Sequence, residues 1–279
     1  INCMRPPRRL CAGRPKRLRS VCVWTALPLR RFNRENQDSM AEMEALPTLG
    51  GLLTGDSGPD VQSMAALALA EICRENRENQ TIVADLGTIA SVVVLLKHAT
   101  SMEVRAECAG AIWVLSDHHE NNKISFASAG AIASLVSLLA SGTQRAQEHA
   151  VNALAALSLD NVDNLTQVTT LLVQLLGSGD LAAKSIAAAT LWRLVQENPS
   201  VQTAIASAGS ATDLVTLLKA GSEDARGYAL WSLSLSINEE NQATVLAEGG
   251  VKPLVRMLNV RDITTREQSA AKIALLARN

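Results

Sequence analysis

The sequence is poor in aromatic residues. Only 3 % of its 279 residues are Phe, Trp or Tyr, whereas 47 % are hydrophobic. An apolar content dominated by alanine and leucine favours helices that pack closely through small side chains, and it argues against a β-sandwich. No stretch of 18 uncharged apolar residues occurs, so the sequence predicts no membrane span. The length suits one large domain or two small ones.

Cysteine is also scarce, and its placement argues against a disulfide framework. Five cysteines occur at irregular spacing; three lie within the first 22 residues, whereas Cys73 and Cys108 fall inside apolar helical patterns. No Walker or GxGxxG sequence is present, and we expect no cofactor. These features predict a reduced, intracellular protein, located in the cytoplasm, the nucleus or both.

The first 34 residues contain no acidic side chain. They carry nine arginines and Lys16, which leaves 16 basic and 27 acidic groups in the remaining 245 residues, a net charge of −11. Proline interrupts this basic tail and no helical or strand period is present. We therefore predict that residues 1–34 are disordered, ahead of an acidic body at 35–279.

Four interpretations of the tail stay open. It is translated sequence foreign to the natural protein, or an Arg-rich transit peptide that directs import into an organelle. Alternatively GRPKRLR at 13–19 is a nuclear-localisation patch or an arm that touches nucleic acid. The fourth interpretation is an internal ligand of the acidic body. Nucleic acid is expected as a partner only through this tail.

The remainder of the chain repeats one phrase. It stands as ENQTIVADLGTIASVVVLLK at 78–97, ENNKISFASAGAIASLVSLL at 120–139 and EENQATVLAEGGVKPLVRML at 239–258. Each copy contains an apolar pair whose second member is leucine. These leucines recur 37 to 43 residues apart, at Leu53, Leu96, Leu139, Leu176, Leu218 and Leu258. A period near 40 indicates an array of stacked helical units with these leucines in the core.

Within a unit the pattern is constant. A polar start opens a short helix, a glycine ends it, a second helix follows, and a polar loop leads to a longer third helix. The glycines are Gly87, Gly130, Gly209 and Gly249, and small residues that allow close approach of the third helices are Ala66, Ala109, Ala188 and Ala270. Asn79, at a polar start, is expected to cap a helix. The short step of the fourth unit predicts that it has lost most of its first helix.

These phrases resemble armadillo repeats. The resemblance rests on ENNKISFASAGAIASLVSLL together with AGAIWVLS at 109–116 and GYALWSLS at 227–234. It implies an all-α fold, a right-handed superhelical α-solenoid of about six units with the third helices on its concave side. The expected units are 35–77, 78–120, 121–160, 161–197, 198–238 and 239–279. The pattern is most similar to plant and protist arrays, including those behind U-box ubiquitin ligases, although this sequence contains no U-box.

Two short sequences look like catalytic or metal-binding motifs. GDSGP at 55–59 resembles the nucleophile loop of trypsin-like proteases, but the repeat alignment places it in an interhelix turn. Ser57 or Asp60 is expected to cap the next helix, with Pro59 in its first turn. DHHE at 117–120 has no cysteine nearby, so a solvated loop is a better interpretation than a zinc site. We expect no catalytic residue, no metal and no enzymatic activity.

Importin-alpha, the best-known peptide carrier of the family, repeats asparagine along its third helices. The matching positions here hold Glu71, Val114, Ala156, Arg193, Ser232 and Leu275, none of which is asparagine. The family tryptophan, four residues earlier, is replaced by Leu67, Gly110, Asn152, Ala189, Tyr228 and Ala271. The resemblance therefore does not imply carriage of a nuclear-import peptide.

Three tryptophans share a different register. Trp113, Trp192 and Trp231 each precede the asparagine position by one residue, which places them at the edge of the concave face. Both packing between units and anchoring of a partner would suit them. Glu148, Asp224 and Glu267 lie on third helices two turns before this register, where they would favour a partner with basic and apolar residues.

The sequence thus predicts a non-enzymatic scaffold that binds an extended or helical segment of a protein partner along a concave groove. The candidate groove residues are Glu71, Trp113, Val114, Glu148, Asn152, Trp192, Arg193, Asp224, Tyr228, Trp231 and Ser232. Two alternatives stay open. One is an adaptor in transport or nucleic-acid association that uses the basic tail. The other is the substrate-binding fragment of a larger protein such as a U-box ubiquitin ligase.

Overall fold

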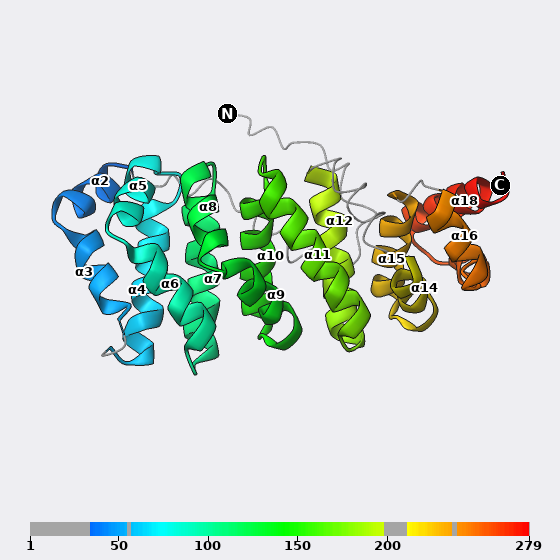
Figure 1. Cartoon of the computed structure of the whole chain (residues 1–279), viewed down its shortest axis with the longest axis horizontal. Coiled ribbons are helices and arrows are strands. Elements are labelled where there is room, and N and C mark those ends of the chain that lie inside the picture. Colours follow the sequence, from blue (N-terminus) through cyan, green and yellow to red (C-terminus); the bar gives the residue numbers. More distant parts are fainter. Residues whose placement is uncertain (1–33, 55–56, 198–210, 236–238, 279) are drawn as a thin grey trace, which may run out of the picture.

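A computed structural model describes residues 34–54, 57–197, 211–235 and 239–278, and all regular elements in these ranges are α-helices. The basic tail, apart from Arg34, and the predicted break at Gly209 lie outside them. The helices are arranged as consecutive units, each stacked on the one before it (Figure 1).

No single helix in this part of the chain is long and apolar enough to cross a membrane. Two bent helix pairs reach that length and composition together: α5 (Arg77–Asp85) with α6 (Thr88–His98), and α8 (Glu120–Ser128) with α9 (Ala131–Ser141).

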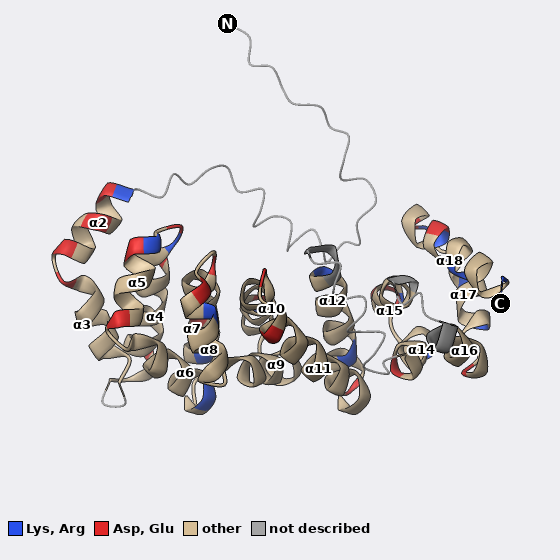
Figure 2. Cartoon of the chain, turned by 45° about the horizontal axis from the view of Figure 1, so that its top comes forward, with Lys and Arg blue, Asp and Glu red and all other residues tan. Residues whose placement is uncertain are grey.

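The first three units each contain two shorter helices and a longer third one. They are α2 (Arg34–Glu42), α3 (Ala45–Leu52) and α4 (Pro59–Cys73); α5, α6 and α7 (Met102–Ser116); and α8, α9 and α10 (Gln144–Ser158). The later units contain α11 (Val162–Ser178) and α12 (Leu181–Glu197); α14 (Ala211–Ala220) and α15 (Glu223–Leu235); and α16 (Glu239–Ala247), α17 (Val251–Met257) and α18 (Ile263–Leu276). Figure 2 shows an arc, with α7, α10, α12 and α15 on its inner, concave side and α6, α9, α11 and α14 on its outer side.

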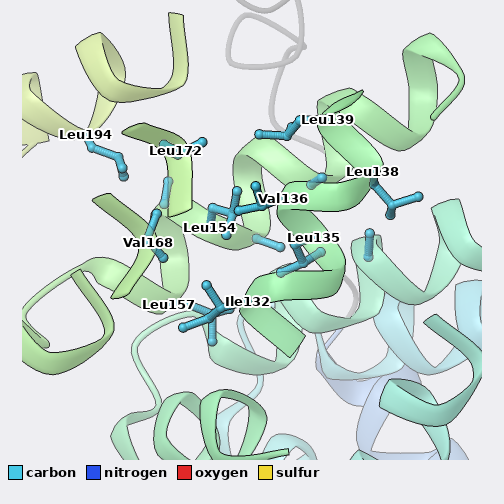
Figure 3. Packing of buried hydrophobic residues seen from close by; sticks show 14 of the residues in the cluster. Ile132, Leu135, Val136, Leu138, Leu139, Leu154, Leu157, Val168, Leu172 and Leu194 are labelled. Carbon is cyan, nitrogen blue, oxygen red and sulfur yellow. The ribbon is translucent and has the colours of Figure 1, made fainter. Parts of the chain in front are cut away.

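The recurring leucines form the core, as predicted, in five of the six units. Leu53, Leu96, Leu139, Leu176 and Leu218 are at most 2 % exposed. Figure 3 shows this core around α9, where Leu135 and Leu139 lie with Leu154 of α10 and Leu172 of α11. The prediction is wrong for Leu258, which is half-buried, and for Ala270, which is exposed. Both belong to the last unit, where no further unit packs over them within the described chain.

The glycines that separate the first and second helices adopt a conformation that other residues rarely take. Gly87, Gly130 and Gly249 have φ of +72°, +82° and +69°, in the left-handed region that glycine enters without steric cost. These three breaks are confirmed. In the first unit Glu44 stands at the same place with φ of +58°, so that unit makes the turn with a less suitable residue.

The fourth unit differs from its prediction. Its first helix is not lost: α11 is one continuous helix that joins the first and second helices of the other units. What is missing is the turn between them, because no glycine interrupts the sequence from Val162 to Leu176. The start of the first helix is kept, since the Asn164 side chain makes the same bonds as its counterparts in earlier units.

Buried asparagines tie each unit to the preceding one. The Nδ2 group of Asn79 donates to Ile72 O at 3.0 Å, in the last turn of α4. Asn122 and Asn164 make the equivalent bonds of 2.8 Å to Leu115 O and 3.0 Å to Leu157 O. Each asparagine also donates to a carbonyl on the first helix of the preceding unit: Gln37, Gln80 and Lys123 respectively. The cap expected from Asn79 is made instead by Asn76, whose side chain accepts from Asn79 N.

The core position of Leu139 gives the first test. Leu139→Ala should lower the free energy of unfolding by about 2–5 kcal/mol, because Leu139 is fully buried and the cavity left behind is lined by packed side chains. Denaturant unfolding measures this loss. The control is Val94→Ala on the exposed outer side of α6, which should change stability by no more than about 0.5 kcal/mol. Equal effects of the two substitutions would contradict the assignment of the core.

Candidate functional site

In the first half of the concave face, the chain's own arginine covers a candidate tryptophan. The Arg74 guanidinium lies over the Trp113 ring, 5.5 Å from its centroid, and pairs with the Glu71 carboxylate at 2.8 Å. Arg74 comes from the end of α4 and Trp113 from α7 of the next unit. Two candidate residues, Glu71 and Trp113, are therefore linked through Arg74, a residue that the sequence analysis did not select.

Beside Trp113 the face is filled by His149. The Nδ1 group of His149 on α10 lies 2.8 Å from Ala106 O, and the ring packs so closely on Gly110 that a Cβ there would come within 2.9 Å of Nδ1. Burial lowers the pKa of His149, although the bond to Ala106 O opposes the shift. Val114, one turn after Gly110, is buried. The candidate Val114 therefore does not present a surface to a partner.

An arginine bridges two acids at the same junction. Arg145 of α10 reaches Glu103 at 2.8 Å and the buried Glu107 at 2.5 Å, both on α7. Burial raises the pKa of Glu107, while the Arg145 charge lowers it and the neighbouring Glu103 raises it. This network joins units two and three and pairs the Arg145 charge with both acids.

The second half of the concave face carries an aromatic cluster, defined here as Trp192, Tyr228 and Trp231. Trp192 on α12 stacks on Trp231 of α15 with ring centroids 4.5 Å apart, and Tyr228 meets Trp231 edge-on at 5.9 Å. Both tryptophans are half-buried. Asp224 lies one turn before Tyr228 on the same face of α15. Its carboxylate forms no ion pair with any residue that the structure describes.

Next to the cluster, a hydrogen bond crosses between units three and four. Arg193, adjacent to Trp192, donates from Nη1 to Asn152 Oδ1 at 2.6 Å. Glu148 lies one turn before Asn152 on α10, is half-buried, and accepts a hydrogen bond from Gln144. Ser232, in contrast, is fully buried. Of the predicted groove residues, the structure thus brings together Asn152 with Arg193 and Trp192 with Tyr228 and Trp231. It buries Val114, Ser232 and Tyr228, so that only the two tryptophans of the aromatic cluster are partly exposed.

The described part of the protease-like loop provides no side-chain cap for α4. The residue before α4 is Gly58, which makes no side-chain cap, so the predicted cap by Ser57 or Asp60 is wrong; Pro59 does occupy the first turn. A cavity of about 260 Å³ nearby is lined by Thr54, Gly87 and six other residues, none of them acidic, basic or histidine. Cys73 and Cys108 are free and buried, and burial raises the pKa of each thiol to about 12, so neither is poised as a nucleophile.

The two adjacent histidines have different roles, and only one is solvated. His118 is exposed, in a left-handed turn with φ of +52°. His119 is buried and caps α8, because its Nδ1 accepts from Asn122 N at 3.3 Å. Its Nε2 lies 3.0 Å from Thr81 Oγ1, whose own proton goes to Arg77 O. The ring is therefore neutral with its proton on Nε2, and the prediction of a solvated loop is wrong for His119.

The residues that the sequence analysis missed are the bridging ones: Arg74, Arg145 and His149. A usable signal was present for Arg145, which lies 42 residues after its partner Glu103, about one repeat period. The same spacing links two predicted groove residues, because Arg193 lies 41 residues after Asn152. Residues one period apart are neighbours in a stack, which makes complementary pairs at this spacing candidates for contacts between units.

Comparisons with known proteins agree with this architecture. Residues 238–277 match the family model described as Armadillo/beta-catenin-like repeat. Among solved structures, a designed armadillo repeat protein in complex with the peptide (KR)4 is similar, with 22 % identity, a TM-score of 0.61, and coverage of 83 % of this chain and 99 % of that one. An engineered protein has 24 % identity, a TM-score of 0.62 and coverage of 84 % and 97 %.

A second engineered protein is 27 % identical with a TM-score of 0.65, covering 88 % of this chain and 61 % of that one. Comparison with curated proteins gives no significant match. Together, the family model and the shared fold confirm the resemblance on which the sequence analysis relied: the helices of this chain form an armadillo-repeat solenoid.

The His119 cap gives a pH-dependent prediction. Burial, followed by the Arg77 charge, lowers the pKa of His119, whereas its backbone hydrogen bond and the acids Asp85 and Glu120 oppose the shift. The unfolded chain therefore binds the proton more readily, and stability should fall as the pH drops below about 6.5. Asparagine caps the equivalent helices in units two and four, so His119→Asn should keep the cap and lose this dependence.

Thermal unfolding of both forms between pH 7.5 and 5 tests this. The difference between them isolates His119, because His149 contributes equally to each. A wild-type chain that loses no more stability than His119→Asn on acidification would contradict a neutral, capping imidazole.

Ser57 supplies a test of the turn interpretation. Ser57→Ala should change the free energy of unfolding by less than about 0.5 kcal/mol, since the side chain makes no cap. A fluorophosphonate probe, which labels activated serines, should not modify the wild-type chain at this position. Covalent labelling of Ser57, detected by mass spectrometry of peptides, would show that the loop is more than a turn.

Proposed function

We propose that this armadillo-repeat chain is a non-enzymatic interaction scaffold whose concave face, at units four and five, binds a segment of a partner protein. The observation that carries the proposal is the aromatic cluster of Trp192, Tyr228 and Trp231, which spans the two units. Half-buried tryptophans anchor protein interfaces because they bury a large apolar area with little loss of conformational freedom.

The two halves of the concave face support this location for different reasons. In units one to three, Arg74, Arg145 and His149 already cover the surface. In units four and five, the tryptophans of the same register face one another, and no described segment lies over them in the way that Arg74 lies over Trp113. A partner side chain on the cluster would therefore displace none of the salt bridges that the described residues form.

The chemistry proposed for the partner is basic with interspersed apolar residues. The body of the chain has a net charge of −11. Asp224, which forms no ion pair with any residue that the structure describes, lies one turn before Tyr228 of the cluster. Arg74 over Trp113 is an internal example of a guanidinium on a tryptophan of this register. The designed armadillo repeat protein solved with (KR)4 has a similar fold and is bound to a basic peptide, which supports a basic partner for this fold. At 22 % identity the similarity concerns the fold and not the individual binding residues.

The test is the binding of a synthetic peptide of alternating arginine and leucine, measured by isothermal titration calorimetry with the full chain. Trp231→Ala should weaken binding by about 30-fold, the effect of removing an aromatic anchor worth roughly 2 kcal/mol. Asp224→Asn should weaken binding at low salt and reduce its salt dependence, because an exposed carboxylate is screened by ions.

The matched control is Trp113→Ala, which removes the same residue type from the same register where Arg74 covers it. It should leave peptide affinity unchanged within about twofold, a difference well below 1 kcal/mol. Thermal unfolding of each variant confirms that the solenoid persists. Equal losses for Trp113→Ala and Trp231→Ala, or no binding by the wild type, would reject the proposal.

A further inference from the structure

Residues one period apart occupy the same place in successive units, so their exposures can be compared directly. Four apolar residues of the first unit are 36–61 % exposed: Met40, Leu52, Val61 and Met64. The residues 43 positions later are at most 8 % exposed: Val83, Leu95, Val104 and Glu107. What differs is that unit two is covered by unit one, through contacts of α4 with α7 and of α3 with α5. Unit one therefore presents the same stacking surface uncovered; we name these four residues the leading face.

Within the described chain, the last unit exposes the opposite surface, the one on which a following unit would stack. Val255 of α17 is 47 % exposed, whereas its counterparts Val93, Val136, Val173 and Val215 are at most 9 % exposed. On α18 the same holds for Ala270, whose counterparts Ala66, Ala109 and Ala188 are fully buried. It also holds for Ala277 just after α18, because the residues at this place in the first three units are buried. We name as the trailing face the exposed or half-buried residues Val255, Leu258, Ala270 and Ala277.

These two faces differ from ordinary exposed apolar positions. Val94 is 55 % exposed, but its counterparts Gly51, Ser137, Gln174 and Thr216 are exposed as well, so this position belongs to the outer surface of every unit. The leading and trailing positions are exposed only at the ends. They are thus the two halves of an interface that consecutive units of this chain already form.

We propose that the leading face of one chain stacks on the trailing face of a second copy. The contact repeats the one between consecutive units, so apolar groups meet apolar groups with the complementarity that the fold already uses. Because it joins two different surfaces in a head-to-tail direction, a pair of copies still presents one free face at each end and can add further copies. Association loses translational freedom that stacking within one chain does not, so it depends on concentration. The inference does not rest on the concave face.

The experiment is sedimentation velocity of the full 29.6 kDa chain over a wide range of concentrations, with one charge placed on either face. The wild type should increase in apparent mass with concentration, past that of a dimer. Val61→Glu removes the leading face, Val255→Glu removes the trailing face, and each variant alone should stay at the mass of one chain. The matched control Val94→Glu adds the same charge on the outer surface and should behave as the wild type.

A mixture of the two face variants separates head-to-tail stacking from other contacts. Each variant keeps one intact face, so the mixture should form a dimer of twice the chain mass and stop there. All three substituted positions are exposed, and thermal unfolding verifies that each variant is folded. A wild-type chain that is monomeric at every concentration would overturn the proposal.

Two other results would also overturn it. A mixture that stays monomeric, or a Val94→Glu variant that loses association, would show that the contact is not head-to-tail. A monomeric wild type that Val61→Glu destabilises would indicate instead that residues 1–33, which join the chain at Arg34, cover the leading face of their own molecule.

Discussion

The long helices α4, α7 and α10 end inside the stack, and their last carbonyl groups must find donors there. The carbonyls of the last turn of a helix have no partner within it, and burying them unsatisfied costs free energy comparable to a lost hydrogen bond. Asn79, Asn122 and Asn164 supply these donors to Ile72, Leu115 and Leu157. Because each asparagine also bonds to the preceding first helix, one side chain holds three helices in a constant relation. These bonds fix the offset between successive units together with the leucine core.

The concave face has the same regular backbone geometry in each unit, but its side chains differ from unit to unit. Trp113 and Trp231 have the same register, yet one lies beneath Arg74 and the other against Trp192. The difference comes from the neighbouring unit: α4 ends in an arginine that reaches forward, whereas α12 offers a second aromatic ring. A repeat array can in this way keep one backbone geometry and still differ along its length in what it presents to a partner, because each position on the face is completed by the adjacent unit.

The same dependence on neighbours explains the two ends. An armadillo unit buries its apolar face only against another unit, and the first and last units each lack one neighbour within the described chain. Polar residues at the terminal positions would remove the conflict, but Met40, Val61 and Val255 are apolar and exposed. Glu107, a carboxylate buried inside the array, has the cation of Arg145 beside it, as the cost of burying an unpaired charge leads one to expect.

The sequence by itself determined the period, the helix pattern and the position of the core. Two local signals were sufficient here. Leucines about 40 residues apart predicted that Leu139 is in the core, and the glycine between two helical patterns predicted the helix break at Gly130. The sequence-based prediction failed where a neighbour decides the outcome. Leu258 repeats the core leucine but lacks a following unit. The continuous α11 is a different case, because the absence of a glycine between Val162 and Leu176 was a local signal that the turn is missing.

For the candidate site, the sequence predicted only which residues lie on the same face of the stacked helices. Spacing placed Trp192 and Trp231 on one face. The angle and distance between stacked units decide that these two rings touch and that Arg74 covers Trp113. They also decide that Val114 and Ser232 are buried. A one-dimensional pattern records which residues share a face. Which of them remain open to a partner is decided by side chains that arrive from the next unit, and only the tertiary structure brings those together.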